Sequence, residues 1–322
     1  MVGSQGFVPD PRNERVKIWL NGQLIPRSEA KVSVFDAGFV LGDGVWEGLR
    51  LVNGRLAFLE AHLDRLYSAA GVLAIDIEMD RESLTEALYR TVQVNGMRDG
   101  VHVRLMVTRG IKATPNQDPR AIVSGPTIVI VAEYKQPDPA GLERGLALVT
   151  SPYRTSAPDV FDMHLNTHSR LNLIQALIQA ANLGADEALM LDPNGHVASC
   201  NATNFFVVRG GTVLTSDGRF CFKGITRGHV IGLCREHGIR IEERDFTLAE
   251  TYTAEEAFVT GTFGGVTPVA TLDGRAFAAG AKGSMTARLA GLYRDLLDTE
   301  CAADRHPARD SVRAAPQLPD EA

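Results

Sequence analysis

Short runs of alternating apolar and polar residues, separated by Asn-Gly dipeptides, characterise the first part of the chain. Asn21-Gly22 and Asn53-Gly54 each lie between two such runs. Because an Asn-Gly pair readily adopts the positive φ angles of a two-residue hairpin turn, each predicts a β-hairpin. Apolar residues spaced three and four positions apart predict helices at residues 60–72 and 80–94. Strand patterns at 101–108 and 127–132 complete an expected α+β unit with an antiparallel sheet.

A proline-containing segment separates this unit from the second part of the chain. Residues 133–145 hold Pro137, Pro139 and several charged side chains, which favours a linker. Beyond it we expect strands at 146–150, 187–191, 204–208 and 212–215, and helices at 170–183, 227–236 and 281–297. The expected organisation is a flexible arm (1–14), an N-terminal α+β domain (15–132), a linker (133–145), a C-terminal domain (146–299) and a disordered tail (300–322).

Composition narrows the classes of protein that fit. The chain has 322 residues, of which 44% are apolar and 22% charged, and this suits two globular domains of roughly 100–200 residues each. Its apolar runs are too short to cross a bilayer, and no signal peptide is visible. Four cysteines without CxxC spacing favour the reducing cytoplasm. A net charge of −6 gives no reason to expect a nucleic acid partner.

Four stretches could bind a ligand, although each also has an ordinary structural explanation. Residues 36–48 contain four glycines, which let a backbone approach a ligand or simply join two strands. Arg65 lies on a predicted helix, where a guanidinium either binds phosphate or remains a solvated charge. Residues 224–227 (GITR) precede a helix whose free N–H groups suit a phosphate or an ordinary cap. Residues 260–265 form another nest of small residues after a strand.

Taken together and in this order, these stretches resemble the class IV aminotransferases. That family comprises pyridoxal-phosphate enzymes and includes branched-chain and D-amino-acid aminotransferases and aminodeoxychorismate lyase. The resemblance extends from about residue 16 to residue 297. The residues that carry it are DAGF at 36–39, GDGVWEG at 42–48, HLDRL at 62–66, Arg104, TRG at 108–110, GADEA at 184–188, NFF at 204–206, GITR at 224–227, GT at 261–262 and TPV at 267–269.

The resemblance implies the two-domain fold-type IV architecture. In that fold a smaller N-terminal α+β domain and a larger C-terminal mixed, β-barrel-like domain with helices hold pyridoxal phosphate in the cleft between them. It also implies a homodimer that acts on amino acids or 2-oxo acids. Arg65 matches the phosphate-binding arginine of the family, and Glu47 matches an active-site glutamate near the substrate. The other cofactor-binding positions that match are Gly224, Ile225, Thr226, Gly261 and Thr262.

One departure from the family concerns the lysine that binds the cofactor as a Schiff base. Its position falls at Leu165 or Asn166, and the next lysine along the chain is Lys223. Lys223 precedes the phosphate turn, where a side chain would meet the phosphate rather than the aldehyde. Arg170 cannot take over the covalent bond because a guanidinium stays protonated. The expected catalytic position is therefore occupied by Leu165 or Asn166, and no replacement for the lysine is evident.

A second departure concerns the ring nitrogen of the cofactor. The family places a glutamate there, and this chain has Ser199. A hydroxyl can only hydrogen-bond the nitrogen, which weakens the ring as an electron sink and fits transamination poorly. Three functions stay open. They are a class IV aminotransferase-like enzyme, an enzyme on the same scaffold with the cofactor bound non-covalently or not used, and a non-catalytic protein that binds a phosphorylated ligand.

The second of these functions would depend on a histidine- and arginine-rich segment. His164, His168 and Arg170, with Asn166, would then hold an anionic substrate, and a histidine would act as general base. The two histidines are four residues apart, as a metal pair on a helix requires, but they precede the predicted helix. Because no third ligand is evident, we expect no metal site, and local hydrogen bonding of both histidines stays an alternative.

Overall fold

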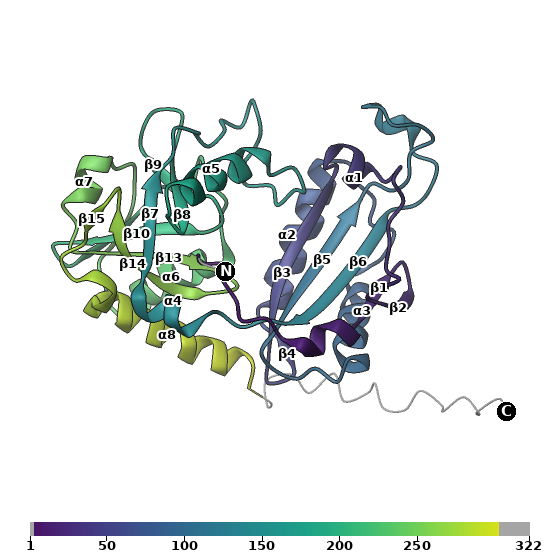
Figure 1. Ribbon diagram of the computed structural model, residues 1–322, viewed down its shortest axis with the longest axis horizontal. Coiled ribbons are helices and arrows are strands. Elements are labelled where there is room, and N and C mark those ends of the chain that lie inside the picture. Colours follow the sequence, from purple (N-terminus) through teal and green to yellow (C-terminus); the bar gives the residue numbers. More distant parts are fainter. Residues whose placement is uncertain (1–2, 303–322) are drawn as a thin grey trace.

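The computed structural model describes residues 3–302, which form two units that each contain one β-sheet (Figure 1). The first sheet has the strand order β2-β1-β6-β5-β3-β4, and all neighbouring strands run antiparallel. Its strands are β1 (Lys17–Leu20), β2 (Gln23–Pro26), β3 (Gly44–Val52), β4 (Arg55–Leu56), β5 (Val101–Thr108) and β6 (Thr127–Tyr134). Asn21 and Asn53 have φ angles of 44° and 51°, so both Asn-Gly turns form the expected hairpins.

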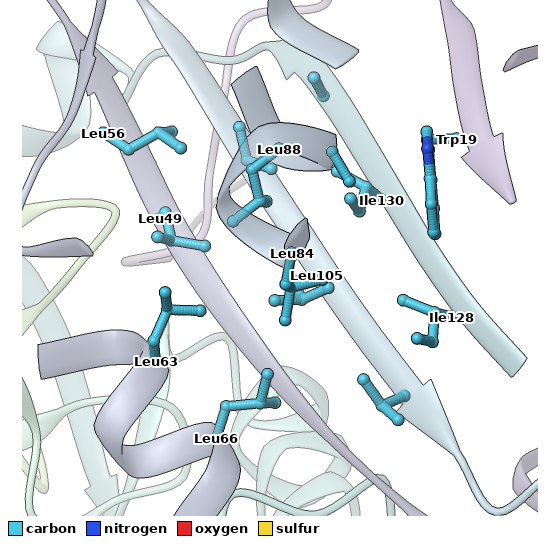
Figure 2. Close-up of a cluster of buried hydrophobic side chains, with 14 of the residues drawn as sticks. Trp19, Leu49, Leu56, Leu63, Leu66, Leu84, Leu88, Leu105, Ile128 and Ile130 are labelled. Carbon is cyan, nitrogen blue, oxygen red and sulfur yellow. The ribbon is translucent and has the colours of Figure 1, made fainter. Parts of the chain in front are cut away.

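The alternation of side chains gives this sheet two different faces. On β5, Val103 and Leu105 are fully buried in an apolar core, whereas Arg104 between them points to the opposite face. Helices α2 (Leu59–Val72) and α3 (Arg81–Val94) cover the apolar face. Figure 2 shows this core, with Leu63 and Leu66 of α2 and Leu84 and Leu88 of α3 directed at the strands. The opposite face is therefore free to line a site.

The second sheet is mixed and wraps around its own core. Its strand order is β12-β11-β10-β13-β14-β7-β8-β9, with β15 paired to β14, and the pairs β11/β12, β14/β7 and β7/β8 run parallel. The strands are β7 (Leu146–Thr150), β8 (Glu187–Leu191), β9 (Val197–Cys200), β10 (Asn204–Arg209), β11 (Thr212–Thr215), β12 (Ile241–Glu243), β13 (Glu256–Gly261), β14 (Gly265–Leu272) and β15 (Arg275–Ala276). Buried apolar side chains from both ends of this order form one cluster, as a curled sheet requires.

Besides the short helix α4 (Pro139–Arg144), four described helices accompany the second sheet. They are α5 (Leu171–Asn182), α6 (Ile225–Glu236), α7 (Leu248–Tyr252) and α8 (Ser284–Glu300). Helices α6 and α8 share a cluster with β10 and β13 in which Phe206 and Phe258 stack. Helix α5 packs on β8 and keeps an exposed side, as described below. Among residues 3–302, no helix combines the length and apolar character that crossing a bilayer requires.

Several segments differ from the expected ones. Strand β3 begins at Gly44, inside the glycine-rich stretch of residues 36–48, because this stretch itself joins the sheet after the short helix α1 (Ala37–Leu41). A side chain at Gly44 would come within 2.6 Å of the Val107 carbonyl oxygen, so the close strand contact requires glycine. Most of the expected linker is structured, since β6 extends to Tyr134 and α4 (Pro139–Arg144) follows, with Asp138 capping α4.

The N-terminal arm is also more ordered than expected over the residues that the structure describes. Ser4 is 7% exposed, and Phe7 forms an isolated bridge with Pro137. The Cβ position of Gly3 lies 2.8 Å from the Asp186 carbonyl oxygen, so the arm reaches the second unit. A 3₁₀-helix, Pro11–Arg15, then leads into β1. Contacts of Gly3, Ser4 and Phe7 thus connect parts of the expected arm to the rest of the chain, and most of the expected tail, from residue 303, lies outside the described part.

Candidate functional site

A cavity of about 590 Å³ lies between the two units. One wall is the polar face of β3 and β5. The other comes from the second unit: the start of α5, the turn between β9 and β10, the start of α6 and the end of β13. Gln5 of the N-terminal arm also lines it. The cavity is thus built by segments far apart in the sequence that the two sheets bring together.

The first turn of α6 forms an anion-binding corner of this cavity. Ile225 and Thr226 line it, and the helix begins at Gly224 without a side-chain cap. The first N–H groups of a helix have no partner within the helix and lie at the positive end of its dipole. Thr262 lines the same corner, and the buried Thr260 hydroxyl beside it has no hydrogen-bond partner among the described residues. These groups can bind a phosphate.

Asn204 at the start of β10 positions that corner. Its side-chain nitrogen donates to the Phe222 carbonyl oxygen at 2.6 Å, and its side-chain oxygen accepts from the Gly224 backbone N–H at 3.2 Å. A Cβ atom at Gly224 would lie 2.3 Å from that oxygen, so this residue has to be glycine. The buried asparagine therefore connects β10 to the turn that begins α6.

Arg65 approaches the same corner from α2 and is held by a buried carboxylate. Glu47 is completely buried and accepts from Arg65 at 2.6 and 2.7 Å, and it pairs with His62 at 2.7 Å. Burial raises the pKa of Glu47, but the hydrogen bonds from Arg65 and His62 outweigh burial and hold that pKa below its usual value. Glu47 lies behind the cavity wall, so it positions Arg65 and its role toward a substrate stays a prediction.

The structure places Asn166, and not Leu165, in the cavity. Leu165 packs against the core of the first unit, whereas Asn166 lines the cavity and is 2% exposed. The amide of Asn166 donates to the Trp46 carbonyl oxygen at 2.5 Å and to Glu47 at 3.4 Å. None of the described residues that line the cavity is a lysine. Lys223 extends along Gly218 instead, where its side chain comes within 3.2 Å of the Gly218 Cβ position.

Arg170 and Arg104 bring two guanidinium groups to the cavity. Arg170 donates to the side-chain oxygen of Asn166 and, at 3.1 Å, to the Thr167 carbonyl oxygen. Arg104 lies 3.7 Å above the Trp46 ring, and Arg170 is 5.7 Å from the centre of the same ring. Burial is the largest cause that lowers the pKa of Arg170, to about 10, and burial also lowers the pKa of Arg104. Both groups remain charged at neutral pH.

Ser199 lines the cavity from β9, and its hydroxyl proton is engaged. The hydroxyl donates to the Thr203 carbonyl oxygen at 2.7 Å. The Thr203 hydroxyl in turn donates to Glu187 at 2.7 Å. Glu187 lies completely inside the protein, and burial raises its pKa to about 8. This buried acid is therefore mainly neutral at pH 7 and supports the turn that carries Ser199.

The two predicted histidines have different places. His168 lines the cavity, and its Nε2 lies 3.2 Å from the Val45 carbonyl oxygen, which can only accept. The proton is therefore on Nε2, and Nδ1 keeps its lone pair; burial lowers the pKa of His168. His164 instead has its Nε2 atom 2.7 Å from the Gly218 carbonyl oxygen and is not among the cavity residues. The structure thus brings His168 together with Asn166 and Arg170, and leaves His164 apart.

Some residues of the site did not follow from the sequence. His102 lines the cavity, where burial lowers its pKa to about 3, and Trp46 and Phe222 provide aromatic surfaces. The polar positions on the otherwise apolar strand β5 were a signal for His102 and Arg104. Outside the cavity, Asp192, His196 and Asp245 bring three potential metal ligand atoms within 4.8 Å of one another, and Arg219 already donates to Asp245 at 3.0 Å.

Comparison with known proteins places the chain beside aminotransferases. Residues 44–272 match the family model described as amino-transferase class IV. Branched-chain-amino-acid aminotransferase-like protein 1 of Arabidopsis thaliana is 41% identical over 291 residues, which cover 90% of this chain and 52% of that protein. The branched-chain-amino-acid aminotransferase of Pseudomonas aeruginosa is 33% identical over 295 residues, which cover 89% and 94% of the two proteins. The chain spans about half the length of the Arabidopsis relative.

The fold also matches a solved structure. The branched-chain amino acid aminotransferase of Thermobaculum terrenum, in its PLP-form (holo-form), superposes with a TM-score of 0.78 at 28% identity, covering 89% of this chain and 95% of that one. This likeness confirms the expected α+β fold of two units with a barrel-like second half.

Proposed function

The chain belongs to the class IV aminotransferases, and on this premise we propose that it is an enzyme that binds pyridoxal phosphate non-covalently and acts on amino acids or 2-oxo acids. The observation that carries the proposal is the anion-binding corner at the start of α6. Arg65, Thr226 and Thr262 converge there, and the unpartnered Thr260 hydroxyl adds a further donor. The similar structure from Thermobaculum terrenum is a PLP-form, in which PLP denotes pyridoxal phosphate.

The described residues of the cavity can bind the phosphate group of the cofactor, but none of them provides an amine that could form a covalent bond with it. Arg65 and the first turn of α6 would hold the phosphate, while Phe222 and the turn that carries Ser199 would border the ring. Asn166 has no nucleophilic amine, and its amide is fully used by Trp46, Glu47 and Arg170. The cofactor, when bound, supplies a carbonyl or amino group and a ring that delocalises electrons.

His168 is the candidate that would move a proton in this site. Because its Nε2–H is donated to Val45, the Nδ1 lone pair is the group that can accept a proton. The lowered pKa keeps the imidazole neutral and able to act as base near pH 7.

The test combines binding, mass and turnover. Titration of the pure protein with pyridoxal phosphate should change its visible spectrum in a saturable way, and borohydride reduction should leave the intact mass unchanged. Thr262→Val should weaken binding about 10-fold, whereas Thr212→Val, on a strand remote from the cavity, should not. A borohydride-stable adduct on one lysine would overturn the non-covalent part. Binding without any conversion of amino acids would instead leave a phospho-ligand binding protein.

We also propose that the active form is a homodimer. The exposed side of α5 is apolar, and its exposed members are Leu171, Ile174, Leu177, Ile178 and Leu183. Ile174 and Leu177 also line the cavity, so a second copy seated on α5 would close the site. Light scattering should give the mass of a dimer, and Ile178→Glu should shift the protein to monomer and lower ligand affinity.

We further propose a cytoplasmic location, supported by four buried cysteines that form no disulfide among the described residues.

A further inference from the structure

The cavity carries more positive charge than the described residues neutralise. Three guanidinium groups, those of Arg65, Arg104 and Arg170, line it. Among residues 3–302, Glu47 is the one carboxylate whose charge raises the pKa of both Arg104 and Arg170, and its oxygens are already bonded to Arg65. Arg104 and Arg170 are half-buried, and taking a cation partly out of water without a counter-ion is costly, so these two groups indicate that the ligand supplies negative charge.

Arg170 has donors left to bind that charge. Two of its five N–H groups are used, one by the oxygen of Asn166 and one by the carbonyl oxygen of Thr167. These bonds fix the guanidinium between the Trp46 ring, 5.7 Å away, and the Phe222 ring, 5.5 Å away. The group is thus held in place by neutral partners, and its remaining N–H groups form a fork suited to a carboxylate.

In this arrangement Asn166 holds Arg170 in position. Its side-chain oxygen accepts from Arg170, and its nitrogen donates toward Trp46 and Glu47, so every polar atom of the amide has a partner. A lysine at this position would offer donors alone and would place a second cation beside Arg170. The residue that replaces the family lysine is therefore a positioning residue for the arginine four residues later.

We propose that Arg170, held by Asn166, is a carboxylate-binding residue, and that the cavity prefers a phosphorylated pyridoxyl ligand that already carries an amino acid over the free cofactor. The inference rests on the proposed function, because the phosphate of that ligand occupies the corner at α6. It deepens that function, since a charge-assisted contact to the amino acid part takes the place of the covalent bond to the protein. Such a contact contributes about 10- to 100-fold in affinity.

The test uses two stable probes and isothermal titration calorimetry with the full chain. Pyridoxamine 5'-phosphate carries the phosphate without a carboxylate, and N-(5'-phosphopyridoxyl)-L-glutamate carries both. The wild type should bind the second probe at least about 10-fold more tightly than the first. Arg170→Gln should remove most of this preference and change the affinity for pyridoxamine 5'-phosphate less than about 3-fold. Arg209→Gln, at an exposed arginine on β10, is the matched control and should keep the preference.

A second readout separates binding from folding. Arg170 is half-buried and its hydrogen bonds within residues 3–302 go to neutral partners, so Arg170→Gln should melt close to or above the wild-type temperature in the absence of ligand. Equal affinity of the wild type for both probes, or a preserved preference in Arg170→Gln, would overturn the inference and leave cofactor binding intact. Failure of pyridoxamine 5'-phosphate to bind at all would overturn the proposed function itself.

Discussion

Replacing Glu47 by glutamine should destabilise the protein strongly, because Glu47 is the buried partner of a cation. The change keeps the size of the side chain and removes the charge that Arg65 contacts at 2.6 and 2.7 Å. Arg65 is only partly exposed, with 17% of its side chain accessible, so water replaces the lost pair poorly. Removing one partner of a buried ion pair costs about 3–5 kcal/mol. At about 2–4 °C per kcal/mol, the melting temperature should fall by roughly 6–20 °C.

Thermal unfolding followed by circular dichroism measures this loss of stability. Repeating the measurement at several pH values shows whether the stabilisation by Glu47 decreases on acidification. The folded-state pKa of Glu47 lies below its ordinary value of 4.5. The stabilisation is therefore complete above the unfolded-state pKa and is lost as the pH falls through the lower folded-state value. The gap between wild type and Glu47→Gln should accordingly be constant near pH 7 and shrink on acidification below about pH 4.5.

Asp64→Asn is the matched control on the same helix. Asp64, on the surface of α2, forms an ion pair with Arg81 of α3, and 67% of the Asp64 side chain is exposed. Exposed ion pairs contribute little, so this variant should melt like the wild type. A melting temperature of Glu47→Gln within about 2 °C of the wild type would refute the reasoning, and so would a gap that persists unchanged in acid.

Three further predictions concern other groups of the site. Glu187→Gln should stabilise the protein increasingly from about pH 5 to pH 8 in chemical denaturation, since the buried acid keeps a proton that the unfolded chain releases; an equal effect at both pH values would contradict this. His168→Ala should lower turnover about 100-fold or more while the calorimetric affinity for pyridoxamine 5'-phosphate stays within about 3-fold, and unchanged turnover would remove this histidine from the mechanism. Asn166→Lys should give a borohydride-stable adduct with pyridoxal phosphate in intact-mass analysis, since Arg170 beside it would lower the lysine pKa; an unmodified mass would show that the new amine does not reach the aldehyde.

Local patterns predicted the first sheet and its helices well, because both depend on short-range chemistry. The Asn-Gly turns and the alternation along β5 determine hairpins and faces within a few residues. The glycine-rich stretch was harder, since Gly44 is required by a contact with the distant Val107 rather than by a turn. Strand β13 was also difficult to delimit, because almost all of its residues are buried and show no alternation. Strand β14 mixes buried and partly buried positions without a regular alternation.

The site was predictable as a set of positions and much less as a set of contacts. Arg65 and Thr226 could be placed by their motifs, whereas the sequence left Leu165 and Asn166 as alternatives; the structure brings Arg65, Thr226 and Asn166 to one cavity. The pairing of Glu47 with Arg65 and His62 depends on how β3 and α2 pack, whereas the bond from Arg170 to Asn166 is local and depends on the loop conformation before α5. No spacing rule predicts such contacts between separate elements.

The N-terminal arm has a consequence for the order in which the chain assembles during synthesis. Gly3 leaves the ribosome long before the Asp186 backbone that it contacts. The Gly264 segment that approaches Ser4 follows later still. The arm is therefore translated early and finds its native neighbours late, and the cavity gains its Gln5 border only after the second unit has formed. Until then the arm is exposed to proteases and chaperones, so its docking marks the completion of the second unit.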